Sequence, residues 1–349
     1  MPEVLSDPRL RQLAGSRVLV TGGGGLVGSR IVAQLAAAGA EAVVLDRFDA
    51  YPHPVRDRFR VDEHAAQVVL GDVRERATVR WLANRADSVV HAAAFADVAA
   101  CTRRPDTAFA ANVHGTQNVL DAVAAAPVKR LVFVSSASVY GDGEPGTVPR
   151  FSEDQPLTPI SVYANTKLWG EHQVRLVLPN SGTEHTIVRY FSVYGEPQVP
   201  KPGSHSWMVP WMAMSAEAEL PLRLNGGGHQ VRDMVHVDDI AHATILALVA
   251  EDTASQIVNI GTGMPSSVRE IAELIAARYP DARFVETPMP AGDPRGGYAD
   301  TRRASDLLGW HPTISLADGV ERYVNWLKST PDAVPDWLTE ANTLAGAAA

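Results

Sequence analysis

Apolar and polar positions in the first half of the chain follow two alternating patterns. Short apolar runs, rich in Val and Leu, occur at residues 18–20, 42–46, 67–72, 88–94 and 130–136. Stretches with helical spacing lie between them, at about 25–38, 77–84 and 105–125. Strands that alternate with helices are joined by right-handed crossovers, so the pattern predicts a parallel sheet with helices on both faces.

The alternation continues through a helix from residue 161 and a strand at 184–190, and then stops. Residues 191–228 contain five prolines, five glycines and no second periodic β–α unit, which predicts a differently built lobe. Regular structure returns with the elements that end the chain. These are a helix from about 237 to 249, a strand at 256–260, a helix at 266–278, a loop-rich stretch at 284–300, and short helices near 301–308 and 316–327.

Composition and charge describe an ordinary globular protein and argue against several partners. The 349 residues are 46% hydrophobic and 20% charged, with a formal net charge of -9. No basic run occurs, which argues against nucleic acid and against an anionic membrane as partners. Cys101 is the single cysteine, and no secretory pattern or long apolar span is found, so we expect a cytoplasmic protein. The histidines lack ligand spacing, so no metal is expected.

The first strand ends at four consecutive glycines, residues 22–25, and a helical pattern follows. Gly22, Gly25 and Gly28 are three apart, and Gly23-x-Gly25-x-x-Gly28 overlaps them. A turn without side chains lets the backbone approach a pyrophosphate, and the N–H groups of the helix start, around Leu26 and Val27, point at its charge. The alternative is an ordinary glycine turn.

Asp46 favours the first interpretation. It ends the second strand roughly 20 residues beyond the glycines, where an acid accepts hydrogen bonds from a ribose 2′-OH. A carboxylate also repels a 2′-phosphate, so we expect NAD rather than NADP, although Arg47 keeps NADP open. Asp72, residues 92–94 and Ser136 also end strands, and the carboxyl ends of parallel strands meet at the edge where such sheets bind ligands.

The sequence therefore predicts a Rossmann-type doubly wound parallel sheet with a smaller, mixed α/β substrate-binding lobe. Residues 1–190, joined by about 236–262, form the NAD-binding domain, and residues 191–235 and 263–328 form mainly the lobe. Residues 329–349 are expected to be a C-terminal tail with a frayed end beyond Thr343. Residues 1–15 are expected to be a surface arm.

The candidate catalytic residues lie at the fifth strand and on the helix from residue 161. Tyr163 and Lys167 are four apart and share a helix face. Tyrosine is a poor base, with an ordinary pKa of about 10, and a nearby ammonium lowers that pKa. The phenolate then takes a proton from an alcohol, and Ser136 can hydrogen-bond the same oxygen. Tyr-x-x-x-Lys also arises by chance on many helices, so the pair gains meaning from its place after the dinucleotide half.

These motifs together resemble the extended short-chain dehydrogenase/reductases of the nucleotide-sugar epimerase and dehydratase type, with likeness to UDP-glucose 4-epimerases. The resemblance spans about residues 16–327. It rests on residues 21–28, 71–73, 91–94, 112–116, 135–141, 163–167, 189–195, 230–239, 259–261 and 299–300.

The resemblance implies further site residues and a homodimer. Asp72 and Val73 are implied to lie by the adenine, and Ala93, Ala94, Asn112 and Phe191 to line the cofactor. Arg232 is implied to hold the substrate's diphosphate, as a guanidinium binds phosphate oxygens through paired donors; without the resemblance, an ion pair with Asp233 is the simpler interpretation. The homodimer is implied to form through the helices near 105–125 and 161–178.

One position narrows the reaction. In relatives that eliminate water, the residues at the positions of Ser136, Ala137 and Ser138 resemble Thr-Asp-Glu. Relatives that decarboxylate keep the glutamate at the position of Ser138. Because this chain lacks these carboxyl groups, elimination of water and decarboxylation are both disfavoured. Oxidation and reduction at one carbon remain, which favours a nucleotide-sugar 4-epimerase that works through a 4-keto intermediate. The alternatives are a 4-ketoreductase that consumes NAD(P)H and, in another class, a noncatalytic dinucleotide-binding regulator.

Two departures from the family pattern concern the sugar pocket. Ser192 stands where asparagine is common, and Pro290 stands where an arginine is usual. Arg295 is a candidate to replace the missing diphosphate contact, and a surface cation is the alternative. Residues 95–97, 192–194 and 206–208 are expected to shape the pocket, and the sequence does not specify which sugar it accepts.

Overall fold

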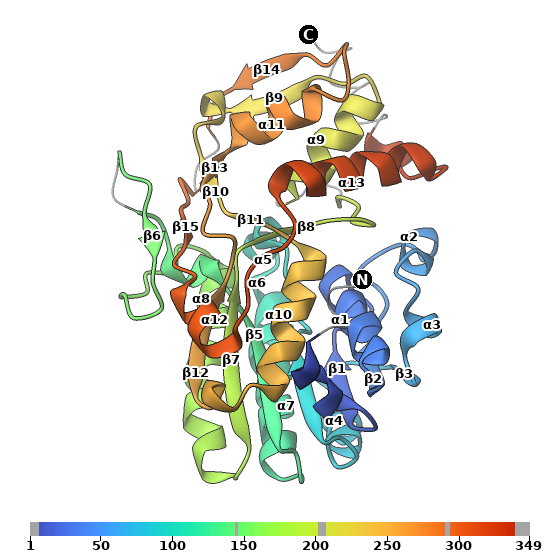
Figure 1. The fold of residues 1–349 in the computed structure, drawn as a ribbon, viewed down its shortest axis with the longest axis vertical. Helices are drawn as coiled ribbons and strands as arrows, with labels where there is room; N and C mark the ends of the chain where they lie inside the picture. Colours follow the sequence, from blue (N-terminus) through green and yellow to red (C-terminus); the bar gives the residue numbers. More distant parts are fainter. Residues whose placement is uncertain (1–6, 144–145, 202–206, 290–293, 339–349) are drawn as a thin grey trace.

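Seven parallel strands form the central sheet of the computed structural model, which describes residues 7–143, 146–201, 207–289 and 294–338. The strand order is β12-β7-β5-β4-β1-β2-β3 (Figure 1). The strands are β1 Arg17–Thr21, β2 Glu41–Asp46, β3 Gln67–Leu70, β4 Ser88–His91, β5 Arg130–Ser136, β7 Glu184–Tyr190 and β12 Gln256–Ile260. The order runs outward in both directions from β1, which confirms the doubly wound fold. The strand order reverses between β1 and β4, and sheets of this kind bind ligands at the carboxyl edge there.

Both faces of the sheet are buried, which explains the continuous apolar runs. Val18 and Val20 of β1 face one hydrophobic core, while Leu19 between them faces the other. The first core is covered by η2 Pro8–Leu13, α1 Leu26–Ala37, α10 Val237–Val249 and α12 Arg302–Leu308. The second is covered by α4 Arg76–Ala83, α7 Thr116–Ala124 and α8 Val162–Val177. Helices on both sides leave the inner strands no solvated face, whereas the edge strand β3 ends at Leu70, which is 75% exposed.

The predicted surface arm is wrong for the residues that are described. The short 3₁₀ helix η2 buries Leu10 and Leu13 in the first core, beside α10. Its start is stabilised by Asp7, whose carboxylate accepts from Arg9 N at 2.9 Å. Three residues make one 3₁₀ turn, so Leu10 and Leu13 point to the same side. This periodicity is too short to be recognised as a helix in the sequence.

The helix expected at about 105–125 is interrupted by a π-helical segment. It consists of α6 Pro105–Ala108, η3 Phe109–Gly115 and α7, where η3 is the π-helix. π segments are rare and occur frequently at functional sites. The segment turns Asn112 toward β4 and α8, as described below.

The smaller lobe contains regular elements that were not predicted (Figure 1). Its core is formed by α9 Met208–Glu217, α11 Val268–Ala276, α13 Leu316–Ser329 and β9 Leu222–Asn225, which pairs in parallel with β14 Phe284–Thr287. The segment before Gly228 therefore contains a helix and a strand, α9 and β9, although its sequence shows no periodic β–α pattern, and the loop-rich stretch 284–300 contains the short strands β14 and β15 Tyr298–Ala299. Helix α9 is buried almost all round, so it lacks the one-sided apolar pattern that marks a surface helix.

Two further segments pack differently from the sequence-based division. Helix α12, assigned to the lobe, contributes Ala304 and Leu308 to the core of the sheet. Within the expected tail, Ala333 and Leu338 are buried in the lobe core. The alanine-rich end beyond Thr343 lies outside the described residues. None of the described helices has the length and apolar composition needed to cross a bilayer.

Short elements complete the chain. Three small strand pairs are β8 Ser192–Tyr194 with β11 Met234–His236, β10 Val231–Arg232 with β13 Ser266–Ser267, and β6 Arg150–Phe151 with β15 Tyr298–Ala299. The remaining helices are α2 His53–Asp57, α3 Val61–His64, α5 Val98–Arg103, η4 Ala137–Tyr140, η5 Leu178–Asn180, η6 Gly226–Gly228 and η7 Glu251–Thr253. The three pairs link the lobe to the carboxyl edge of the sheet.

Candidate active site

The glycine turn after β1 contains glycines at which a side chain would clash with the backbone and one at which it would not. Gly22 has φ +77, and a Cβ there would lie 2.6 Å from Ala93 N. A Cβ on Gly28 would lie 2.1 Å from Gly22 O, so only glycine lets α1 start this close to β1. At Gly25 a Cβ would meet only Gly22 O, at an ordinary 3.5 Å. The fold requires glycine at 22 and 28, whereas Gly25 leaves space in front of the helix start.

That space fits a dinucleotide diphosphate. Gly25 is the N-cap of α1 and makes no side-chain cap, and Leu26 and Val27 form the start of the first turn. The first N–H groups of a helix have no partner within the helix and carry a partial positive charge. A diphosphate at this position would accept from them.

The carboxylate of Asp46 is held beside the turn. It accepts from Gly24 N at 2.9 Å and from Phe48 N at 2.7 Å. Burial raises the pKa of Asp46 above its ordinary value, and these two N–H groups oppose the rise. The ring of Phe48 covers Gly24, because a Cβ on Gly24 would lie 2.6 Å from it. Phe48 was not predicted, although an aromatic residue two positions after such an acid is a usable signal.

The charges around Asp46 are mainly acidic. Arg47 pairs with Asp49, and its Nη1 lies 3.3 Å from Asp72 Oδ2. Asp72 also accepts from Arg74 Nη2 at 2.7 Å. Burial alone would raise the pKa of Asp72, but Arg74 and Arg47 hold it below its ordinary value. Both guanidinium groups are thus paired with acids, which disfavours their use in binding a 2′-phosphate.

Residues after β4 form the next part of this edge. Ala93 N lies 3.3 Å from Thr21 Oγ1, which ties the β4 end, with the adjacent Ala94, to the end of β1. Val73, which follows Asp72, is buried, and a Cβ on Gly115 would lie 2.6 Å from Val73 Cγ2. The structure therefore brings Ala93 beside the glycine turn and packs Val73 against the helix that carries Asn112.

Asn112 is bound to protein groups. Its Oδ1 accepts from Phe95 N at 2.7 Å, and its Nδ2 donates to Phe95 O at 3.2 Å and to Thr166 Oγ1 at 3.0 Å. These bonds join the loop after β4 to α8, one residue before Lys167. In this structure Asn112 organises the edge of the site through these contacts.

Ser136, Tyr163 and Lys167 come together at the end of β5. Ser136 caps η4 by accepting from Ser138 N at 3.1 Å and donates to Ser138 Oγ at 3.1 Å, and its hydroxyl acts to lower the pKa of Tyr163. Lys167 is buried, and its Nζ donates to Val134 O at 2.8 Å. The ammonium lies 6.0 Å from the centre of the Tyr163 ring. The three predicted residues thus share one edge of the sheet.

The pKa of Tyr163 differs from the expectation. Burial raises this pKa to about 12, and the hydrogen bond with Ser136 opposes the rise. Burial also lowers the pKa of Lys167 to about 8. The expected lowering by Lys167 does not occur in this structure, because its Nζ is directed at a main-chain carbonyl and desolvation of the partly buried Tyr163 outweighs the opposing effect of Ser136.

The predicted substrate residues lie where the lobe meets the sheet. Ser192 N donates to Asp233 O at 2.9 Å, and β8 pairs with β11 in parallel. Phe191 is buried and packs against the rings of Tyr140 and Phe151. Phe191 therefore supports the end of β7 from within the core.

Arg232 and Arg295 lie on neighbouring segments. Val231 N donates to Arg295 O at 2.8 Å, and Arg232 Nη1 donates to Pro294 O at 3.0 Å. The Arg295 side chain is half-exposed and its Nε lies 3.1 Å from Asp142 Oδ2. The 294–296 segment thus carries one cation, Arg295, and contacts a second, Arg232. Pro290 and Ser206 lie outside the described residues.

Asp233 is not explained by an ion pair with Arg232. Its buried carboxylate accepts from Thr262 N at 2.7 Å, Thr262 Oγ1 at 2.6 Å, Gly263 N at 2.9 Å and Ala299 N at 3.0 Å. These four bonds hold the segment after β12 and β15 against β11. The sequence placed Arg232 and Asp233 side by side, but the fold uses Asp233 to join backbone segments.

Two buried histidines were not predicted as site components. His91 Nδ1 lies 2.7 Å from Thr21 Oγ1 and Nε2 lies 2.9 Å from Thr116 Oγ1, and burial lowers its pKa to about 3. Neutral His91 therefore ties the end of β1 to α7. The usable signal is a polar residue inside an apolar strand, which must find partners when buried.

His236 belongs to a group of three residues with metal-ligating side chains, the others being Glu196 and Asp238. His236 Nε2 lies 3.3 Å from Glu196 Oε2. Arg30 of α1 already supplies positive charge there, since its Nε lies 3.4 Å from Asp238 Oδ1 and its Nη2 lies 4.0 Å from Glu196 Oε1. This arrangement accounts for the two carboxylates without a metal ion, and the expectation of no metal stays a prediction.

Comparisons with known proteins agree with this geometry. Residues 18–261 match the model of the NAD dependent epimerase/dehydratase family. A UDP-glucose 4-epimerase of Streptomyces lividans is 32% identical over 337 residues, covering 92% of this chain and 98% of the relative. A structure of the Thermotoga maritima UDP-glucose 4-epimerase with UDP-glucose is similar with a TM-score of 0.82 at 27% identity, covering 89% and 98% of the two chains. A structure of the Bacillus cereus UDP-glucuronic acid 4-epimerase, with UDP-glucuronic acid and NAD, has a TM-score of 0.81 at 27% identity, covering 89% and 99%.

Proposed function

Because the chain belongs to the NAD dependent epimerase/dehydratase family, we propose that it epimerises a nucleotide-diphosphate sugar at C4 with NAD as cofactor. One observation carries the proposal. Tyr163, Lys167 and Ser136 meet at the carboxyl edge of the sheet that also holds the glycine turn and Asp46. A proton-transfer group and a dinucleotide site thus share one crevice.

The residues of the chain divide the reaction between them. NAD, held at the glycine turn and beside Asp46, would supply the hydride acceptor and donor for oxidation and reduction at C4. Tyr163 removes the proton of the C4 hydroxyl and gives it back after the ketone has turned. Ser136 hydrogen-bonds the same oxygen, and the Lys167 ammonium stabilises the phenolate. With an unliganded pKa of about 12, Tyr163 needs both contributions to act near neutral pH.

The neighbours of Ser136 argue against elimination of water. Ala137 has no functional group, and the Ser138 hydroxyl accepts from Ser136 Oγ at 3.1 Å. Neither offers a carboxylate that could protonate a leaving hydroxyl or remove a proton from carbon. Chemistry at this position is therefore limited to the single carbon that Tyr163 and Ser136 address.

Asp46 supports NAD over NADP, since its carboxylate points at the turn and Arg47 and Arg74 are engaged by acids. Within the proposal, Arg232 and Arg295 bind the sugar nucleotide's diphosphate, with Ser192 and Ser138 at its sugar. Similar proteins use UDP-glucose or UDP-glucuronic acid, and we propose a UDP-sugar here.

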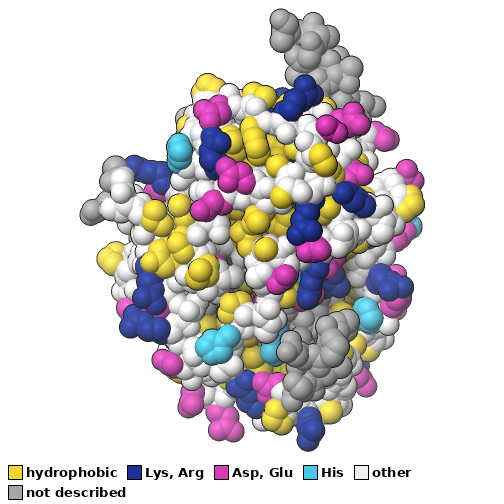
Figure 2. All heavy atoms as spheres, turned by 45° about the horizontal axis from the view of Figure 1, so that its top comes forward, with side chains coloured by type: hydrophobic (Ala, Val, Ile, Leu, Met, Phe, Trp, Pro, Cys, Tyr) yellow, Lys and Arg dark blue, Asp and Glu magenta, His cyan; other side chains and the backbone are white. Residues whose placement is uncertain are grey.

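We also propose a cytoplasmic homodimer. On the helices named for the contact, Phe109 and Leu176 are 46% and 69% exposed, and burying such side chains between two copies would be favourable. The buried, unpaired Cys101 suits a reducing compartment. Acidic and basic side chains are interspersed over the face drawn in Figure 2, without a basic stripe of the kind that nucleic-acid binding needs.

We propose the same division of the chain as the sequence indicated. The NAD-binding domain comprises residues 1–190 with 236–262, and the lobe comprises mainly 191–235 and 263–328.

The test is to incubate the purified protein with UDP-, dTDP- and GDP-sugars without added cofactor and to follow C4 epimers by NMR. Epimer formed with substoichiometric NAD is the expected result. Stoichiometric oxidation of NADH without an epimer would instead establish the alternative, a 4-ketoreductase. Binding without turnover of any sugar, with Tyr163 intact, would leave the noncatalytic regulator.

A further inference from the structure

One face of α8 is attached to the last three residues of β5. Lys167 Nζ donates to Val134 O at 2.8 Å, Glu171 Oε1 accepts from Ser135 Oγ at 2.5 Å, and Ser136 acts to lower the pKa of Tyr163. Residues 163, 167 and 171 are four apart, so they lie on the same face of the helix. Glu171 has no role in the proposed reaction, yet it occupies the third position of this face.

Glu171 is one half of a fully buried ion pair. Its side chain and that of Arg189 are 2% and 1% exposed. Arg189 of β7 donates from Nε to Glu171 Oε1 at 2.9 Å and from Nη2 to Oε2 at 2.7 Å. With the Ser135 hydroxyl, three donors thus satisfy one carboxylate. Such two-pronged pairs fix geometry as well as charge.

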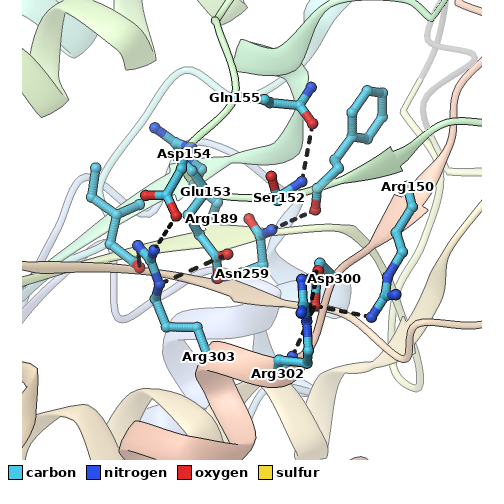
Figure 3. Close-up of polar contacts among 12 residues, drawn as sticks. Arg150, Ser152, Glu153, Asp154, Gln155, Arg189, Asn259, Asp300, Arg302 and Arg303 are labelled. Atoms are coloured by element: carbon cyan, nitrogen blue, oxygen red, sulfur yellow. Dashed lines mark hydrogen bonds and ion pairs between the residues drawn. The ribbon is translucent and has the colours of Figure 1, made fainter.

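Arg189 is in turn fixed from the opposite side. Its Nη1 donates to Tyr140 OH at 2.9 Å, and Tyr140 donates to Asn259 Oδ1 at 2.6 Å. Asn259 N donates to Glu153 Oε1 at 2.9 Å (Figure 3). Tyr140 follows Ser136 in η4, and Asn259 is in β12. The pair is therefore held by groups of β5, η4 and β12, and it cannot shift without disturbing several satisfied hydrogen bonds.

The same carboxylate acts on the charge of Lys167. Four titratable groups face the ammonium: Tyr163 and Glu171 from α8, Cys101 from α5 and His91 from β4. His91 is neutral, and burial keeps the Cys101 thiol protonated by raising its pKa to about 12. Tyr163 is protonated as well at neutral pH. Glu171, which is ion-paired with Arg189, is the carboxylate of this set.

We propose that Glu171, paired with Arg189, is a positioning residue that holds the face of α8 carrying Tyr163 and Lys167 on the end of β5 and keeps the Lys167 ammonium charged. Its kinetic consequence rests on the proposed function. Burial disfavours the ammonium, and the carboxylate offsets this, so loss of the negative charge favours a neutral amine.

The test measures Lys167 directly. The chain has four lysines, Lys129, Lys167, Lys201 and Lys328, so protein labelled with [¹³Cε]-lysine has few signals to assign, and K167M identifies the one of interest. In E171Q we expect Lys167 to titrate about one pH unit lower than in the unmodified protein. E184Q is the matched control, because Glu184 pairs with Arg130 at the opposite end of the same two strands. Its Lys167 titration should not change.

E171Q leaves a buried guanidinium without its partner and risks misfolding. E171M/R189M removes both charges and keeps the side-chain volume, so it serves as a second variant. It should also lower the pH at which Lys167 titrates, by less than E171Q. An unchanged Lys167 titration in the folded variants would overturn the proposal.

Kinetics give a second readout. Because activity needs the ammonium, the alkaline limb of kcat should move to lower pH in E171Q, with KM for the sugar nucleotide changed less than about threefold. A uniform fall of kcat at all pH values would contradict the charge role of Glu171. The NMR titration needs no substrate. If the unmodified protein epimerises no sugar, the proposed function fails and the Lys167 result still stands.

Discussion

Replacing Gly25 and Gly28 separately by alanine should separate cofactor binding from folding. Both belong to the same glycine motif, yet their surroundings differ. A Cβ on Gly25 meets one protein atom at 3.5 Å, whereas a Cβ on Gly28 would lie 2.1 Å from Gly22 O and 2.7 Å from Gly23 Cα. Each added methyl group is the same, so any difference reports what lies in front of it.

For G25A, the expected change in folding stability is small. Gly25 has φ -90 and ψ 176, a conformation that alanine adopts freely. The loss of unfolded-state entropy stabilises by about 0.4–1 kcal/mol, and the poorer N-cap costs a similar amount. The methyl group would, however, push a diphosphate away from the helix start. Losing one or two charge-assisted hydrogen bonds costs about 2–4 kcal/mol. This corresponds to a roughly 30- to 700-fold rise in the Kd for NAD.

For G28A, the cost falls on the fold. The methyl group overlaps the Gly22 carbonyl, so α1 must move away from β1 or the turn must open. Overpacking of this kind costs about 1–3 kcal/mol. For a chain of 349 residues, this lowers Tm by roughly 1–4 °C.

The assay is isothermal titration with NAD, together with thermal unfolding of the cofactor-free proteins. G25A should unfold like the unmodified protein and bind NAD weakly, whereas G28A should unfold at lower temperature. Unchanged NAD affinity in G25A would refute the assignment of the α1 start as the diphosphate site. An unshifted Tm in G28A would show that the close contact with Gly22 is relieved without cost.

Three further predictions concern individual polar groups. Y163F should lower kcat by on the order of 10² to 10⁴ and leave the Kd for NAD unchanged; turnover near that of the unmodified protein would mean that another group moves the proton. D46N should weaken NAD and strengthen NADP binding, changing the ratio of the two Kd values by roughly 10-fold or more, and titration with both cofactors checks this. His91 has a folded pKa of about 3 against about 6.5 when unfolded, so the unfolded chain binds more protons between these values and stability falls as the pH falls through this range. H91N should remove up to about 1.4 kcal/mol per pH unit from that slope in urea unfolding, and an identical slope would show that His91 is not the group responsible.

The sequence predicted the sheet well because its inner strands are buried on both faces. Val18, Leu19 and Val20 contact different cores, so the run contains no polar position that could hide it. Helices α1 and α4 lie close to the positions where they were expected. Helix α4 buries one apolar face, formed by Val79, Leu82 and Ala83. Such local signals are read directly, since neighbouring residues determine them.

The lobe was predicted less well for the opposite reason. Helix α9 is surrounded by other elements, so its apolar residues show no single face. Strand β14 pairs with β9 across about 60 residues of chain, and it exposes Phe284 and Val285. A helix that distant segments bury on all sides lacks the one-sided apolar pattern of a surface helix. A strand that pairs with a distant strand need not show a pattern in its own sequence.

The sequence by itself determined the residue types that meet at the carboxyl edge, because strand ends in a parallel sheet share that edge whatever the loops do. It could therefore name Gly25, Asp46, Ser136 and the Tyr163–Lys167 pair. Only the tertiary structure decided which groups those residues contact. Lys167 donates to Val134 O, and Glu171 is paired with Arg189, which lies 18 positions away in the chain. Helix spacing places side chains on a face, but the partner and the charge on each group depend on the distant segments that bury them.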